Sequence, residues 1–226
     1  TKMDEVDMVA ALTWGEDFDL RVKMDKVKEQ LDKVGWKTLE NKLILSACRI
    51  VLNLERHQTN AEKTSEAIKE NPNIFQKVTP ILIHVAKFLA ECGIHSPKML
   101  PYSYQHILLV AALCSNPHPN QQIFQQLKGW LWRTAYLEKF SGINEANLQK
   151  AYDDIRNLAQ DKMPIRGEFT TDNITPLPKR FILGTSSRAK LLALRWAELN
   201  PLDITGKSIN AGNLLGLHGK DAILRL

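Results

Sequence analysis

A basic stretch near the C-terminus is the strongest charge feature of the sequence. Lys179 to Arg195 holds five cations and no acidic residue. Arg188 and Arg195 are seven residues apart, so a helix would carry both on one face. Such a row of cations predicts contacts to the phosphates of a nucleic acid. The alternative, which the pattern favours somewhat more, is a solvated basic face whose charges have partners elsewhere in the fold. The candidate nucleic-acid-binding residues are Lys179, Arg180, Arg188, Lys190 and Arg195.

Aromatic residues gather between positions 129 and 142. Trp132, Tyr136 and Phe140 are spaced by four and would form one stripe on a helix, with Trp130 off that stripe. Beside the basic residues of this segment, such rings could stack on unpaired bases. A stripe of this kind is more typical of packed core, and core packing is our prediction.

Other patterns that bear on chemistry are weaker. Cys92 and His95 have the C-x-x-H spacing of two metal ligands, but a structural zinc site needs four and no second closely spaced pair exists. The segment 184–188 offers hydroxyls at a helix start without the frame of a phosphate-binding loop. Adjacent carboxylates such as Asp153 and Asp154 do not face each other on a helix. We therefore expect no catalytic residue, no metal ligand and no cofactor.

The spacing of apolar residues predicts helices and no convincing strand. The fold class is therefore all-α, an irregular bundle of about eight to ten helices. The segment 102–114 is almost wholly apolar after its first turn, as in the buried centre of a bundle. We expect helices over 3–14, 20–34, 38–52, 60–70, 74–92, 102–114, 120–141, 144–160 and 186–200, with one further short helix near the C-terminus.

Several local signals refine these elements. Thr38 has the character of an N-cap for the third helix. Pro80 lies inside the fifth and predicts a kink or a break. Prolines and a glycine make 161–183 a long irregular loop. We expect a helical bundle over 1–160 and, over 161–226, that loop plus a basic helix packed on the same bundle, as one domain.

Composition bears on the partners of the protein and on its location in the cell. The chain has 226 residues, 44% of them hydrophobic, and a net charge of +5, which permits an anionic partner without requiring one. Its three cysteines are an odd number beside apolar runs, which indicates reduced, buried thiols. The sequence shows no membrane span and no secretion signal, so we expect a cytoplasmic protein without a membrane partner. It begins with Thr1, and we expect a fragment of a longer protein.

Three segments together resemble one family. Lys2 to Leu12 resembles the helix that follows the F-x-R-I-N-x-x-G-x-x-L-s motif in the DGQQR-motif proteins, the GmrS-like family with a ParB-type nucleotidase/nuclease fold. The segment 129–142 resembles that family's W-x-W-x-x-x-x-x-x-x-Y-s-g helix, with Phe140 in the Tyr place. The segment 180–206 resembles its late R-x-k-x-x-l…P-x-d-x-x-G pattern. Trp132, Arg188 and Gly206 match pattern positions, and the resemblance implies an architectural role for them.

The resemblance implies a function that the residues alone do not. The family is similar to modification-dependent restriction and phage-defence enzymes, with a DGQQR site in an N-terminal domain and an HNH-type nuclease module fused or paired. This sequence has neither pattern, so the resemblance implies a non-catalytic helical C-terminal part that supports an upstream catalytic domain and contacts DNA. The alternative is a free-standing helical module that binds another protein through an apolar groove between helices.

Overall fold

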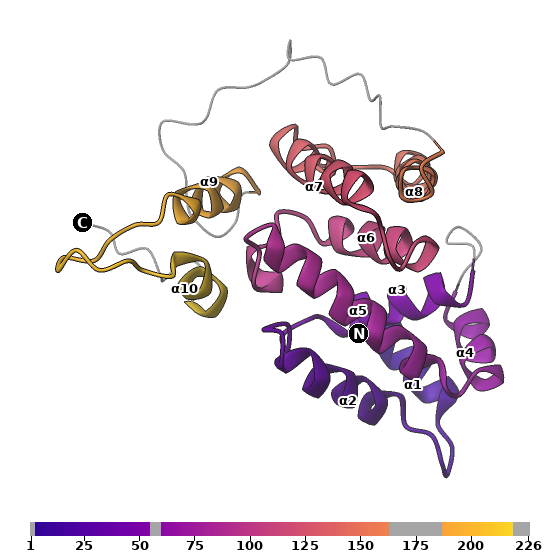
Figure 1. The fold of residues 1–226 in the computed structure, drawn as a ribbon. Helices are drawn as coiled ribbons and strands as arrows, with labels where there is room; N and C mark the ends of the chain where they lie inside the picture. The colour runs from indigo at the N-terminus through magenta and orange to yellow at the C-terminus, as the bar shows by residue number, and fades with distance from the viewer. Residues whose placement is uncertain (1–2, 55–59, 163–186, 219–226) are drawn as a thin grey trace.

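Helix α6 (Ser103–Ser115) lies at the centre of the protein in this computed structural model (Figure 1). Nine consecutive residues, from Gln105 to Leu113, are buried. A helix can bury every face only when other helices surround it, and α3, α5 and α8 all pack against α6. The prediction that the apolar segment 102–114 forms the centre of the bundle is confirmed.

The structure describes residues 3–54, 60–162 and 187–218, and all of its regular elements in these ranges are helices. The predicted all-α class with eight to ten helices is confirmed, since ten α-helices and one short 3-10 helix are present there. Besides α6, they are α1 (Glu5–Thr13), α2 (Leu20–Asp32), α3 (Asn41–Val51), α4 (Ala61–Glu70), α5 (Ile74–Glu91), η2 (Pro97–Met99), α7 (Gln121–Tyr136), α8 (Glu145–Ala159), α9 (Ser187–Glu198) and α10 (Ala211–His218).

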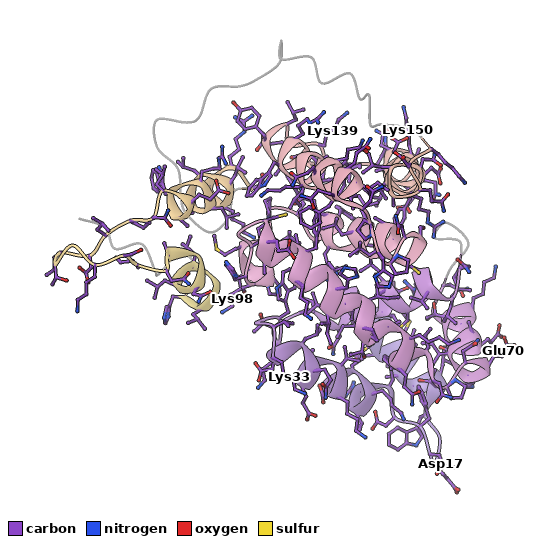
Figure 2. All side chains as sticks on the ribbon, viewed as in Figure 1. Asp17, Lys33, Glu70, Lys98, Lys139 and Lys150 are labelled. Atoms are coloured by element: carbon purple, nitrogen blue, oxygen red, sulfur yellow. The ribbon has the colours of Figure 1, made fainter. Side chains whose placement is uncertain are left out.

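The remaining helices form layers on either side of α6. On one side α2 packs on α5 and α1 packs on α4, while on the other side α7 packs on α8. Helix α9 contacts α7, and α10 contacts both α9 and η2 (Figure 1). Charged side chains such as Lys33, Glu70 and Lys150 lie at the outside of this arrangement (Figure 2). Among the described residues, no helix combines the length and the apolar character that crossing a membrane requires.

Two local predictions differ from the structure. Thr38 is not an N-cap, because α3 begins at Asn41 after Glu40, and Glu40 makes no side-chain capping bond. A turn closed by the Leu39 amide on the Trp36 carbonyl, at 3.1 Å, delays the helix. That turn buries Trp36 and Leu39, and their burial outweighs the capping preference of Thr38.

The sequence predicts a kink or a break at Pro80, and α5 runs through it without a break, so that part of the prediction is wrong. Pro80 lacks the amide that would bond to the carbonyl of Gln76. Both residues lie on the exposed face, where solvent can satisfy that carbonyl. Val78 and Leu82 flank the proline on the other face and are fully buried. Their packing holds the helix together across the missing bond.

The predicted boundary near residue 160 is only partly described. Helix α8 ends at Ala159, and the loop predicted over 161–183 lies outside the described residues except for its first two positions. Helix α9 packs on α7 and α10, and its buried residues are Ala189, Leu191, Ala193 and Leu194. The predicted division into 1–160 and 161–226 stays a prediction, because the connection between the two parts is not described.

Candidate nucleic-acid interface

The predicted row of cations is only partly described. Lys179 and Arg180 lie outside the described residues. Arg188, Lys190 and Arg195 are all on α9, as the sequence predicts. Whether they can contact phosphates depends on where each side chain ends, and the three differ.

Arg188 is turned toward the bundle. Its Nε lies 3.1 Å from Oε2 of Glu138, and its side chain is only 14% exposed. The hydroxyl of Ser187 is 2.7 Å from that of Tyr102 and donates to the other Glu138 oxygen at 3.5 Å. We call Tyr102, Glu138, Ser187 and Arg188 the polar latch, because they join the start of α9 to the end of α7 and the start of α6.

The ammonium group of Lys190 is also hydrogen-bonded within the protein. Its Nζ donates a hydrogen bond of 3.0 Å to the carbonyl of Leu100, just before α6. Burial lowers the pKa of this ammonium group below its ordinary value, because the charged form loses solvation. This half-buried ammonium, held by a backbone carbonyl, joins α9 to the segment before α6.

Arg195 is different, with 64% of its side chain exposed. It pairs at 2.6 Å with Glu198, one turn further along α9. An exposed pair of this kind contributes little stability and exchanges readily for another anion. Of the three candidate cations that the structure describes, Arg195 is therefore the most exposed to solvent.

The aromatic segment departs from the predicted stripe. Helix α7 ends at Tyr136, which is 45% exposed, so Phe140 lies beyond the helix. Phe140 is buried against Tyr102 and Trp130 at ring-centroid distances of 5.8 and 6.2 Å. Trp132 is only partly buried. The prediction of core packing is confirmed for Phe140. The prediction of one stripe is wrong, because the chain turns after Tyr136 and places the Phe140 ring against Trp130.

Cys92 and His95, the two residues of the C-x-x-H pair, lie beside different helices. Cys92 is buried at the end of α5, and burial raises the pKa of its thiol to about 12. His95 lies against α10, where its ring approaches Gly212. In the described part of the chain, no three His, Cys, Asp or Glu residues come close enough to hold a metal ion together.

Sequence reasoning missed a projecting segment between α9 and α10. We call residues 199–210 the C-terminal arm, which extends away from the helices at the left of Figure 1. A bridge pairs Leu202 with Ser208. At the tip, an oxygen of Asp203 accepts bonds from the Thr205 hydroxyl at 2.7 Å and the Thr205 and Lys207 amides at 2.8 and 3.0 Å. These bonds, led by that of the hydroxyl, lower the pKa of Asp203.

The arm exposes large apolar side chains. Leu199 is 77% exposed, Leu202 is 62% exposed, and Ile204 at the tip is fully exposed. Gly206 has φ +80°, a conformation that favours glycine, and it completes the turn. Pro201, Asp203 and Gly206 were the sequence signal for this turn, but no periodicity showed that it would project.

Comparison of this chain with protein-family models, with curated proteins and with solved structures finds no match.

Proposed function

We propose that this chain is the helical, non-catalytic region of a GmrS-like phage-defence or restriction protein, and that the C-terminal arm packs against the catalytic domain of that protein. The observation that carries the proposal is the exposure of Leu199, Leu202 and Ile204 on one projecting segment. Neighbouring exposed apolar side chains are typical of a surface that another protein or domain covers.

The family part of the proposal rests on the resemblance alone, and two of its pattern positions lie in the C-terminal part of the chain. Arg188 joins α9 to the bundle through Glu138, and Gly206 forms the turn of the arm. The architectural role that the resemblance implies for them stays a proposal. The alternative is a free-standing module whose arm docks on a separate protein, and an HNH-type nuclease module would be one such partner.

The test begins with the gene that encodes this chain. A DGQQR motif upstream of Thr1 supports the family, whereas a reading frame that lacks one refutes it. In the full-length protein, we expect the amides of Leu202 to Lys207 to exchange with deuterium at least tenfold more slowly than in the isolated chain, because docking excludes water.

Ile204→Asp should abolish that protection, since it places a charge in an apolar contact. The matched control is Leu12→Asp, which changes an exposed leucine on α1 that lies outside the arm. Equal exchange of the arm amides in the isolated chain and in the full-length protein would refute docking within that protein.

A second function, contact with DNA, is supported by the exposed guanidinium of Arg195 alone among the described cations of the predicted row. It is a weaker proposal, because Arg188 and Lys190 have partners in the fold.

A further inference from the structure

An exposed tryptophan lies in the short connection between α1 and α2. Trp14 directly follows α1, and 71% of its surface is exposed. Leu12, in the last turn of α1, is 43% exposed. Tryptophan is highly buried on average, and it is enriched at protein–protein interfaces. We call residues 14–19 the α1–α2 turn, and the groups around Trp14 decide which partner this turn fits.

The α1–α2 turn is fixed by backbone bonds and by packing. The amide of Gly15 donates to the carbonyl of Phe18 at 3.2 Å, and the amide of Phe18 donates to the carbonyl of Gly15 at 3.3 Å. These two bonds close a loop over residues 16 and 17. The Phe18 ring lies 6.4 Å from the ring of Phe75 on α5, which anchors the loop to the bundle. Trp14 therefore belongs to a preorganised turn, and a partner that binds it has little ordering entropy to offset.

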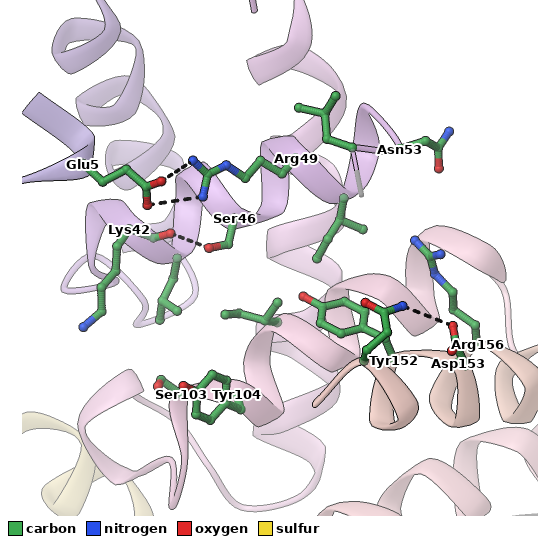
Figure 3. A pocket seen from close by; sticks show the side chains of 15 residues that line it. Glu5, Lys42, Ser46, Arg49, Asn53, Ser103, Tyr104, Tyr152, Asp153 and Arg156 are labelled. Atoms are coloured by element: carbon green, nitrogen blue, oxygen red, sulfur yellow. Dashed lines mark hydrogen bonds and ion pairs between the residues drawn. The ribbon is translucent and has the colours of Figure 1, made fainter. Parts of the chain in front are cut away.

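Negative charge gathers in this part of the chain. From the first described residue to the start of α2, the sequence holds six carboxylates and no Lys, Arg or His, although the whole chain has a net charge of +5. Three of these carboxylates are bonded within the protein. Both terminal nitrogens of Arg49 bond to Glu5, at 2.7 and 3.3 Å (Figure 3). Asp7 pairs with Arg21 at 2.6 Å, and Asp19 accepts bonds from the first amides of α2.

The two carboxylates at the tip of the turn are different. Glu16 and Asp17 are exposed, and neither bonds to another residue that the structure describes. Figure 2 shows Asp17 at the tip, directed away from the helices. Lys23 lies over the Phe18 ring instead, with its Nζ 5.9 Å from the ring centroid. The Cα atoms of Trp14 and Glu16 are at most about 7.6 Å apart, so an exposed indole and two open carboxylates share one small surface.

We propose that the α1–α2 turn binds an arginine-bearing basic segment of a partner protein. An arginine guanidinium stacks on the face of the Trp14 indole, and its N–H groups donate to the carboxylate of Glu16 or Asp17. Arginine fits better than lysine, because its planar group stacks and forms paired hydrogen bonds at once. The carboxylates repel nucleic acids and anionic membranes, and an uncharged apolar partner would cover them without a bond. The inference does not depend on the arm or on the family.

The test uses a designed probe with the full chain, because the partner is unidentified. The probe is a fluorescein-labelled peptide of about eight residues, at roughly 3.3 Å per residue long enough to cross the turn, in which arginine alternates with serine. The same peptide with citrulline in place of arginine keeps the planar group and removes its charge. A lysine version keeps the charge and removes the planar group. Fluorescence anisotropy gives the affinity, and chemical shifts of the isotope-labelled chain locate the site.

We expect the arginine peptide to bind more tightly than either variant peptide, with the largest shifts at the Trp14 indole N–H and the Gly15 amide. General attraction cannot produce this binding, because the chain as a whole carries a charge of +5. Trp14→Ala should weaken it about threefold, since the contact between the cation and the ring is lost. The matched control is Trp196→Ala, which removes a tryptophan that is 46% exposed on α9 and should leave the affinity unchanged.

The charge of the turn is tested separately. Glu16→Gln combined with Asp17→Asn should weaken the arginine peptide about fivefold, since two exposed ion pairs are lost. The control combines Asp153→Asn with Asp154→Asn. It removes the same charge from exposed positions of α8, on the other side of α6 from the turn, and should leave the affinity unchanged (Figure 1). All of these side chains are exposed, so the variants should keep the thermal midpoint of the wild type.

Other results would overturn the proposal. Equal binding of the citrulline peptide, or equal losses in the turn and control variants, would remove the role of the carboxylates. Shifts at the turn from vesicles of zwitterionic phosphatidylcholine, with none from the arginine peptide, would make it a membrane contact. Self-association that Trp14→Ala abolishes would make it an interface between copies of this chain. No shift at millimolar arginine peptide would show that the turn does not bind a basic segment.

Discussion

His106 is a titratable side chain at the centre of the fold. It is buried on α6 and stacks on Trp36 with ring centroids 5.6 Å apart, and neither ring nitrogen has a hydrogen-bond partner among the residues that the structure describes. Burial lowers its pKa from 6.5 to about 4, because the imidazolium would lose its solvation. The unfolded chain therefore takes up a proton at a higher pH than the folded chain. The contribution to stability is complete above pH 6.5 and is lost as the pH falls from there toward 4.

We predict that the free energy of unfolding falls by about 3 kcal/mol from this one group over that interval. Urea unfolding at a series of pH values measures it. The variant His106→Phe keeps a flat ring against Trp36 and should show a smaller fall. His118→Phe, at an exposed loop position, is the matched control. A wild type and a His106→Phe variant with the same pH dependence would contradict the prediction.

At the scale of the element, α10 is held by a close approach. A Cβ added at Gly212 would lie 2.9 Å from Cδ2 and 3.1 Å from Nε2 of the His95 ring. We predict that Gly212→Ala displaces α10 and lowers the protection of its amides from hydrogen exchange at least tenfold. Gly15→Ala is the control, because a Cβ there meets no atom within 4 Å. Unchanged protection of Ala211 to His218 would show that the His95 ring moves aside.

Helix existence could be predicted from the sequence, while helix ends depended on tertiary contacts. Asn60 and Asn144 cap α4 and α8 with their side chains, at the positions where the sequence predicts these two helices to begin. The prediction that Thr38 caps α3 was wrong, because Trp36 and Leu39 are buried in a turn before that helix. Periodicity also extended α7 through Phe140, although the chain turns at Glu138, which has φ +51°. A single sequence does not show which competing local contact the fold favours.

The candidate site could be predicted even less well. Spacing placed Arg188, Lys190 and Arg195 on α9, but it could not show that Glu138 and the Leu100 carbonyl, distant in the sequence, take two of them. The same limit applies to the pocket that Arg49 of α3 and Arg156 of α8 line, because no local pattern joins these two residues. Long-range packing decides which charges remain open to a partner.

At the scale of the whole molecule, the exposed charge of Arg195 sets the expectation for DNA. We predict weak, salt-sensitive binding of duplex DNA, which Arg195→Glu weakens about tenfold. Fluorescence anisotropy at low and near-physiological salt measures both effects. Lys33→Glu, an exposed change on the distant α2 side, is the control (Figure 2). Arg188→Glu would be a poor probe, since it also breaks the polar latch.

Absence of any binding at low salt would end the proposal of DNA contact and leave the docking of the arm untouched. Equal loss of binding in Arg195→Glu and Lys33→Glu would indicate attraction by net charge alone.

The burial of α6 on every side also has a consequence for synthesis on the ribosome. Its last neighbour, α8, ends at Ala159, some 44 residues after α6 ends at Ser115. At about 5–20 residues per second, roughly 2 to 9 s pass before that neighbour is made. During this time the most apolar helix of the nascent chain lacks one of its covers. A holdase chaperone acting at this stage of translation would meet Ile107 to Leu113 first.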